Sequence, residues 1–162
     1  EPHEKFQLEK NTILTSMEPE EIRRILDADL RDFNYIRGVS NHMGSLATED
    51  ARVMEIVLKE LKRRNLYFLD SYVTPQSVAS ALARKVGLRF AVRDVFLDNV
   101  EDPAYIKKQI QKLKSKAKSS GRAVGIGHDR RITLEVLAEV IPQLKKEGYR
   151  LVFVSDLAKC IF

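Results

Sequence analysis

The chain has 162 residues, of which 44% are hydrophobic and 31% charged, and its formal net charge at pH 7 is +5. This is the composition of an ordinary globular polypeptide that can bury one sizeable core, so we expect a single domain over residues 1–162. No window approaches the roughly 18 to 20 apolar residues that cross a bilayer, and the single Cys160 excludes an internal disulfide.

Helix and strand patterns alternate from the start of the chain. Thr15 and Glu18 have the spacing of a capping box, and apolar residues at helical intervals then predict a helix over 17–33. A short strand is expected over 36–41, followed by a turn at Gly44.

The middle of the chain repeats this alternation. Thr48 is expected to cap a helix with the inner face Ala51, Met54, Val57, Leu58 and Leu61, and 66–69 is a compact apolar strand. Thr74-Pro75 is expected to open a helix that ends at Gly87 and buries Val78, Ala81, Leu82 and Val86. A third strand is expected over 88–92.

The last part adds two helices and two strands. A loop over 95–100 leads to a helix that begins at Asp102-Pro103 and ends at 119–121, and a glycine-thinned strand follows over 123–127. The next helix is expected to place Leu134, Leu137, Ile141 and Leu144 inward, and 151–154 is expected to form a fifth strand.

Much of the positive charge lies on the helix that begins at Asp102. Lysines surround a narrow apolar stripe on this helix, as is typical of a helix whose outer side faces solvent. These lysines are Lys107, Lys108, Lys112, Lys114, Lys116 and Lys118. No basic stretch is interleaved with aromatic residues, so we expect no nucleic-acid partner.

Short apolar strands separated by amphipathic helices predict parallel strands covered by helices, an α/β fold. Parallel connections bring the C-terminal ends of the strands to one side, where such folds place their ligands. Every expected strand ends in a polar pair: Asn41-His42, Asp70-Ser71, Arg93-Asp94, His128-Asp129 and Ser155-Asp156. We therefore predict a functional site among these strand ends.

Histidines and carboxylates that converge in a cleft suit metal-dependent hydrolysis. They can hold a divalent cation such as zinc, which lowers the pKa of a bound water, while a second histidine protonates the leaving group. The sequence has no Gly-x-Ser-x-Gly elbow, Walker loop or Gly-x-Gly-x-x-Gly fingerprint, which argues against a serine hydrolase and a nucleotide enzyme.

Four linked motifs carry a family resemblance. They are Ser40-Asn41-His42-Met43-Gly44-Ser45, Phe68-Leu69-Asp70-Ser71, Arg93-Asp94-Val95-Phe96-Leu97-Asp98-Asn99 and Gly125-Ile126-Gly127-His128. In this order and spacing, and over about 1–156, the chain resembles the divergent polysaccharide deacetylase family. The resemblance implies an incomplete, distorted (β/α) barrel, an acetylated carbohydrate substrate, a divalent metal such as zinc, and an exported, periplasmic or envelope-associated setting.

The resemblance also implies roles for single residues. His42 would help to hold the metal, Asp70 would position or deprotonate the water, and His128 would act as the general acid. The remaining motif residues would orient ligand or neighbouring groups: Asn41, Ser71, Arg93, Asp94, Asp98 and Asn99.

One departure from the family pattern keeps an alternative open. Members usually begin with a strand that ends in an Asp-Asp metal-site pair, followed by two further strands, and no such pair occurs in this chain. We expect this chain to correspond to the C-terminal two-thirds of such a domain, with exposed strand edges that favour a homo-oligomer. The alternative is a catalytically inactive glycan-binding or envelope-organising module on the same fold.

Overall fold

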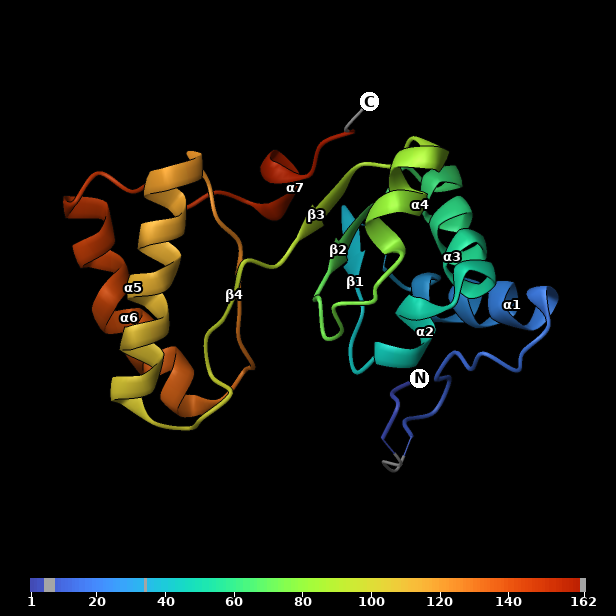
Figure 1. The fold of residues 1–162 in the computed structure, drawn as a ribbon, viewed down its shortest axis with the longest axis horizontal. Helices are drawn as coiled ribbons and strands as arrows, with labels where there is room; N and C mark the ends of the chain where they lie inside the picture. The colour runs from blue at the N-terminus through green and yellow to red at the C-terminus, as the bar shows by residue number, and fades with distance from the viewer. Residues whose placement is uncertain (5–7, 34, 161–162) are drawn as a thin grey trace. The chain divides into compact units, whose positions relative to one another are not determined.

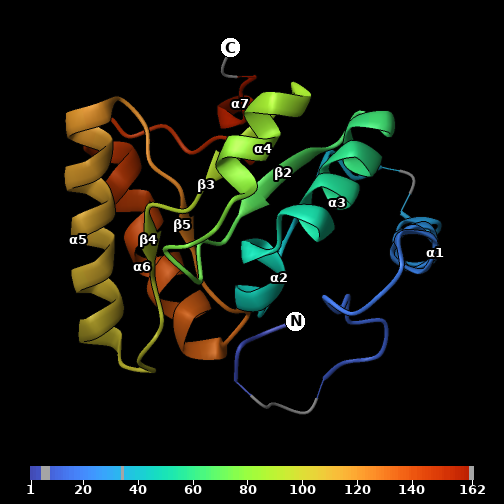
Figure 2. The same cartoon turned by 45° about the vertical axis from the view of Figure 1, so that its right-hand side comes forward.

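The computed structural model describes residues 1–4, 8–33 and 35–160. The chain divides into two compact units, one formed by Glu1–Val92 with the residues from Ala158 onward, and the other by Arg93–Leu157. Figures 1 and 2 label their helices and strands. Within the described ranges, no helix combines the length and apolar character that spanning a bilayer requires. The expected single domain stays a prediction.

The first unit contains a parallel sheet with the strand order β1-β2-β3. Its strands are β1 (Gly38–Ser40), β2 (Tyr67–Asp70) and β3 (Phe90–Val92). Ser40 is in register with Leu69 and Asp70 with Val92, so the C-terminal ends of the strands share one edge. The predicted parallel α/β arrangement is confirmed.

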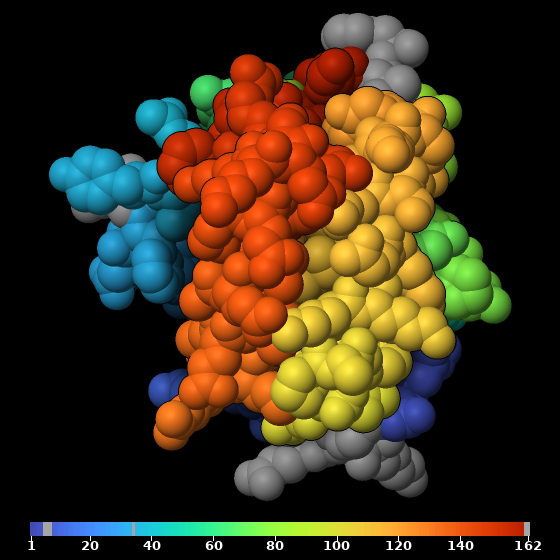
Figure 3. Space-filling view, turned by 90° about the vertical axis from the view of Figure 1, so that its left-hand side faces the viewer, coloured from blue at the N-terminus to red at the C-terminus, as the bar shows by residue number. Residues whose placement is uncertain are grey.

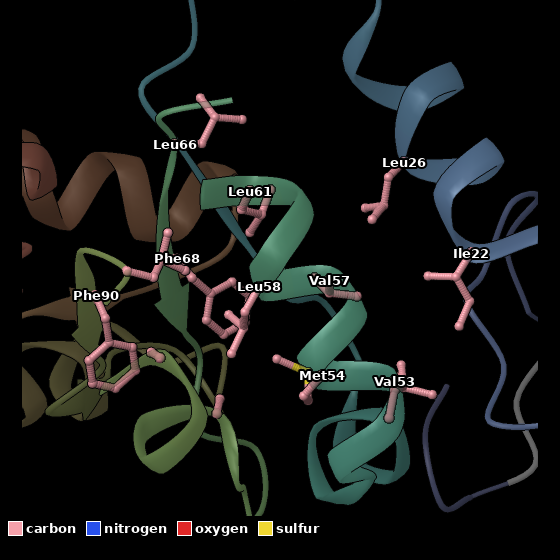
Figure 4. Packing of buried hydrophobic residues seen from close by; sticks show 14 residues of the cluster. Ile22, Leu26, Val53, Met54, Val57, Leu58, Leu61, Leu66, Phe68 and Phe90 are labelled. Atoms are coloured by element: carbon pink, nitrogen blue, oxygen red, sulfur yellow. The ribbon is translucent and has the colours of Figure 1, made fainter. Parts of the chain in front are cut away.

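Helix α3 organises the core of the first unit. The helices are α1 (Pro19–Leu30), α2 (Ser45–Glu49), α3 (Ala51–Arg63) and α4 (Ala79–Val86). Figure 4 shows Leu58 and Leu61 of α3 directed toward Phe68 and Leu66, while Val53 and Val57 lie on the side of α1. Since α3 is apolar on both of these flanks, it joins α1 to the sheet.

Several local expectations for the first unit are wrong. Glu18 rather than Thr15 stands at the start of α1, and it makes no side-chain cap bond. Asp50 caps α3 by accepting a hydrogen bond from Val53 N, because Thr48 already lies in α2. Residues 74–76 form a turn ahead of α4, and Ala51 and Ala81 are exposed.

The second unit pairs two short parallel strands with two helices. Strand β4 (Val95–Phe96) lies beside β5 (Gly125–Ile126), both labelled in Figure 2. Helix α5 (Pro103–Ser120) and helix α6 (Arg131–Lys146) share a core with β4. Figure 3 shows the two helices side by side, α5 in yellow tones and α6 in orange.

Three expectations for the second unit also need correction. The expected loop over 95–100 contains β4, which parallel pairing with β5 stabilises. The buried face of α6 is Thr133, Val136 and Val140, so Leu134, predicted to point inward, is 55% exposed. The expected strand over 151–154 is absent, because 151–153 are irregular and Val154 begins the short helix α7 (Val154–Leu157).

Candidate functional site

The predicted site residues fall into two clusters. The Asp70 cluster, in the first unit, consists of Asn41 and His42, which follow β1, together with Asp70 and Ser71 at the end of β2 and directly after it. The Asp98 cluster, in the second unit, consists of Asp98, His128 and Thr133. Because β4 and β5 are parallel, the segments after their C-terminal ends deliver Asp98 and His128 to the same place.

Asp98 is fully buried and accepts hydrogen bonds on both carboxylate oxygens. Its Oδ1 lies 3.0 Å from Nδ1 of His128. Its Oδ2 accepts from the backbone N of His128 at 2.8 Å and from Oγ1 of Thr133 at 2.7 Å. The carboxylate is therefore held from three directions.

These bonds decide the charge of Asp98. Burial by itself would raise the pKa of Asp98, but the hydrogen bonds from Thr133 and from the backbone and ring of His128 outweigh it and lower the pKa. An ionised carboxylate only accepts, so Nδ1 of His128 is the ring nitrogen that carries the proton toward Asp98. The His128 side chain is 37% exposed, and Nδ1 is the ring nitrogen that faces the buried carboxylate.

The surroundings of His128 fix its ring and loop. The ring packs at a tilt against Phe96, with centroids 5.3 Å apart, and the Arg93 guanidinium lies 5.3 Å from the centroid of the same Phe96 ring. Arg130 donates from Nη1 to the carbonyl O of Asp98 at 2.9 Å and pairs with Glu101. Arg130 is thus engaged within its own unit.

The other two predicted residues of this unit do different things. Asp94 accepts a hydrogen bond from Val124 N at 2.8 Å on Oδ2, and its Oδ1 lies 3.7 Å from Nζ of Lys116. These contacts link the segments before β4 and β5. Asn99 is exposed in the loop after Asp98.

Asp70 is as buried as Asp98, with 1% of its surface exposed, but its partners are structural. Its Oδ1 accepts from Tyr72 N at 2.8 Å and its Oδ2 from Ser77 Oγ at 2.7 Å. Both bonds close the loop between β2 and α4. The role of Asp70 toward water stays a prediction.

Asn41 joins the two strand ends of the Asp70 cluster. Its Oδ1 accepts from Ser71 N at 2.8 Å, whereas its buried Nδ2 finds no hydrogen-bond acceptor among the described residues. His42 is exposed in the bend that follows. Asn41 and His42 line a cavity of about 300 Å³. Its other walls come from the segment before α1, from residues around β1 and α2, and from a few apolar residues of α1, α3 and β2.

Sequence reasoning missed several of these residues. Thr133 lies on the same buried face of α6 as Val136 and Val140. A hydroxyl residue at a position that otherwise repeats apolar residues was the signal that could have identified it. Ser77 gave no such signal, because it lies in the loop before α4.

A further group in the first unit was also missed. The Glu49 carboxylate accepts from Thr74 Oγ1 at 2.5 Å and lies 2.9 Å from Nε2 of His3, on the wall of a cavity of about 610 Å³. The Thr74 bond lowers the pKa of Glu49, and the His3 ring adds to this effect. His3 therefore has a carboxylate partner.

A bound metal ion would need several donor side chains close together. Among residues 1–4, 8–33 and 35–160, no group of three or more His, Cys, Asp or Glu side chains is arranged to hold one. A stable protein site for zinc generally needs at least three such ligands. The described residues therefore do not by themselves fit the predicted metal.

Comparisons with known proteins agree on one family. The model of the divergent polysaccharide deacetylase family matches residues 1–158. An uncharacterized protein of Escherichia coli K12, YibQ, is 36% identical over 143 residues, which are 88% of this chain and 45% of that protein. An uncharacterized protein of Haemophilus influenzae is 36% identical over 120 residues, which are 74% of this chain and 42% of that protein.

A solved structure has the same fold. The crystal structure of the uncharacterized protein ATU2773 from Agrobacterium tumefaciens C58 matches with a TM-score of 0.95 at 22% identity, over 98% of this chain and 65% of that one. The chain thus spans less than half the length of the two curated relatives above.

Proposed function

The chain belongs to the divergent polysaccharide deacetylase family, and from this premise we propose that it takes part in hydrolysis of the amide or ester bond of an acetylated carbohydrate. The observation that carries the proposal is the Asp98–His128 pair, in which a fully buried carboxylate faces Nδ1 of a partly exposed imidazole. An imidazole oriented in this way by a carboxylate is the usual form of a histidine general acid or base.

The proposed step uses Nε2 of His128. Hydrolysis adds water to the acyl carbon and breaks its bond to the sugar nitrogen or oxygen, which leaves as an amine or an alcohol once it has gained a proton. His128, protonated on both nitrogens, gives the Nε2 proton to that departing atom. Asp98 then faces the neutral ring through Nδ1. The proton that the added water loses balances the one that His128 gives away, and through solvent it restores the Nε2 proton.

The divalent metal, zinc in the prediction, is a separate proposal. The described residues do not supply three ligands, and no step above depends on a metal. His42 is the residue that we propose to contribute to such a site, and exposure in the bend after β1 leaves its ring accessible. Metal analysis of the purified protein, repeated for His42→Ala, tests this proposal, and an unchanged metal content would count against His42.

We also propose that the family's (β/α) barrel is completed by strands beside those described. In the described part of the chain, β1 pairs with β2 alone, and unpaired strand edges recruit further strands or copies. Export to the periplasm or cell envelope belongs to the same family-based proposal. Light scattering tests whether these strand edges recruit partners. We expect this chain to associate, and a stable monomer would contradict the proposal.

Acetate release decides the main proposal. The protein is incubated with N-acetylated and O-acetylated oligosaccharides, with and without added Zn²⁺, and acetate is quantified. Release that is lost in His128→Gln supports the proposal, and full release by that variant overturns it.

A non-catalytic glycan-binding or envelope-organising role is the second candidate. The observation that favours it is the engagement of both Asp70 oxygens by Ser77 and Tyr72, which leaves the predicted base only 1% exposed. Binding of acetylated oligosaccharides without any acetate release would select this role.

A further inference from the structure

Thr133 is a buried hydroxyl residue that the proposed proton transfer does not use directly. It lies in the first turn of α6 with 1% of its surface exposed, and its Oγ1 donates to Oδ2 of Asp98 at 2.7 Å. A buried hydroxyl is costly unless it is hydrogen-bonded. This bond therefore gives the Thr133 hydroxyl a hydrogen-bond partner, and it also restricts the position of the Asp98 carboxylate.

The constraint acts on the rotation of the carboxylate. Oδ2 is held by two donors, Thr133 Oγ1 and the backbone N of His128, which approach it at 2.7 and 2.8 Å. When Oδ2 is fixed in this way, the carboxylate plane cannot turn about its last side-chain bond. Oδ1 then stays directed at Nδ1 of His128, 3.0 Å away.

Gly127 provides the room that this arrangement needs. A Cβ atom at position 127 would lie 3.2 Å from Cγ2 of Thr133 and 3.5 Å from Oδ2 of Asp98. The first distance is tighter than ordinary carbon packing, so a larger residue would push Thr133 away from the carboxylate. The close approach, rather than an unusual backbone angle, favours glycine here.

We propose that Thr133 is a positioning residue for His128. By locking Asp98, Thr133 keeps the imidazole proton on Nδ1, so that Nε2 is the nitrogen that exchanges protons with substrate. The inference rests on the proposed role of His128 in hydrolysis, but its structural part concerns the ring tautomer alone.

The test is ¹⁵N NMR of the histidine ring at a pH at which it is neutral. The His128 signals are assigned by comparison with His128→Gln. The original chain is expected to show the Nδ1-protonated form. Thr133→Val, which keeps the side-chain shape without the donor, is expected to shift the ring toward the Nε2-protonated form that free imidazole side chains prefer in water. Thr133→Ser, which keeps the hydroxyl, is expected to restore the Nδ1-protonated form.

Thr48 offers a matched control. It is also 1% exposed, and its Oγ1 donates to the carbonyl O of Gly44 at 2.7 Å in the first unit. Thr48→Val removes the same hydroxyl group at a different site, and it should leave the His128 tautomer unchanged. An unchanged tautomer in Thr133→Val as well would overturn the proposal.

Two further measurements distinguish loss of the positioning role from loss of folding and from absence of hydrolysis. If Thr133→Val does not fold, Gly127→Ala takes its place, and it must shift the tautomer in the same direction for the proposal to stand. In acetate release, Thr133→Val should lower kcat about tenfold or more with little change in KM, as is usual for partners that orient a histidine ring. A protein that releases no acetate overturns the proposed hydrolysis, and the tautomer then decides the positioning role by itself.

Discussion

Asp70 and Asp98 occupy equivalent places in two regions of the chain and have different environments. Both carboxylates are buried near the C-terminal end of a short parallel strand: Asp70 is the last residue of β2, and Asp98 follows the end of β4. Asp70 is bound by a backbone amide and a serine, whereas Asp98 faces an imidazole that is 37% exposed. The strand end thus determines where each carboxylate lies. The hydrogen-bond partners of the carboxylate determine whether that carboxylate can influence proton transfer.

The largest expected effect separates the histidines of the two regions. His128→Gln should lower the rate of acetate release by about 10²- to 10⁴-fold, the usual contribution of a general acid. His3→Gln is the control, and it should keep the original rate because His3 bonds Glu49 instead. Equal losses in both variants would contradict the assignment.

The two carboxylates should also differ in stability. Asp98→Asn is expected to lower the free energy of unfolding by about 1–3 kcal/mol, because the amide group cannot accept from all of the donors around it. Asp70→Asn should cost less, since the Ser77 hydroxyl can turn and accept from the new amide. Urea unfolding of both variants measures the difference, and a larger loss for Asp70→Asn would refute this account.

Acid should act on the Asp98 region in a defined direction. The pKa of Asp98 is lowered from its ordinary value of 3.8, so its ionised form adds stability that is fully present above that value. This stability is lost as the pH falls through the lower, folded-state pKa. Urea unfolding between about pH 2 and pH 6 should therefore show a smaller acid-induced loss in Asp98→Asn than in the original chain. Parallel curves for the two proteins would contradict the prediction.

The smallest expected effect concerns the helix caps, where the two units use the same device. Asp50 accepts from Val53 N at 2.9 Å and Asp102 from Tyr105 N at 2.6 Å. Replacement of either residue by alanine should cost about 1 kcal/mol. Hydrogen exchange should report faster opening of α3 in Asp50→Ala and of α5 in Asp102→Ala. As a control, Asp129→Ala alters an exposed turn and should stay within about 0.5 kcal/mol of the original.

Much of the fold could be predicted from the sequence because its signals are local. The proline and aspartate at 102–103 predicted the start of α5, and Gly87 predicted the end of α4, where it adopts a φ of 66°. For α6 the prediction was wrong at Leu134, which is exposed, whereas Leu137 and Leu144 pack against the core as expected; an apolar residue beside the buried face looks the same in the sequence as one within it. The strand over 151–154 was wrong because a short apolar run does not by itself distinguish a strand from other structure.

The sequence by itself determined the family and most of the alternation of helices and strands, since motif spacing and hydrophobic periodicity are written along the chain. It also marked Asp98 and His128 as site residues. Only the tertiary structure decided their pairing, because the two residues are 30 positions apart and meet through the parallel contact of β4 and β5. Thr133 and Gly127 acquire a role for the same reason: a hydroxyl donor and a missing Cβ matter only where another segment comes to lie against them.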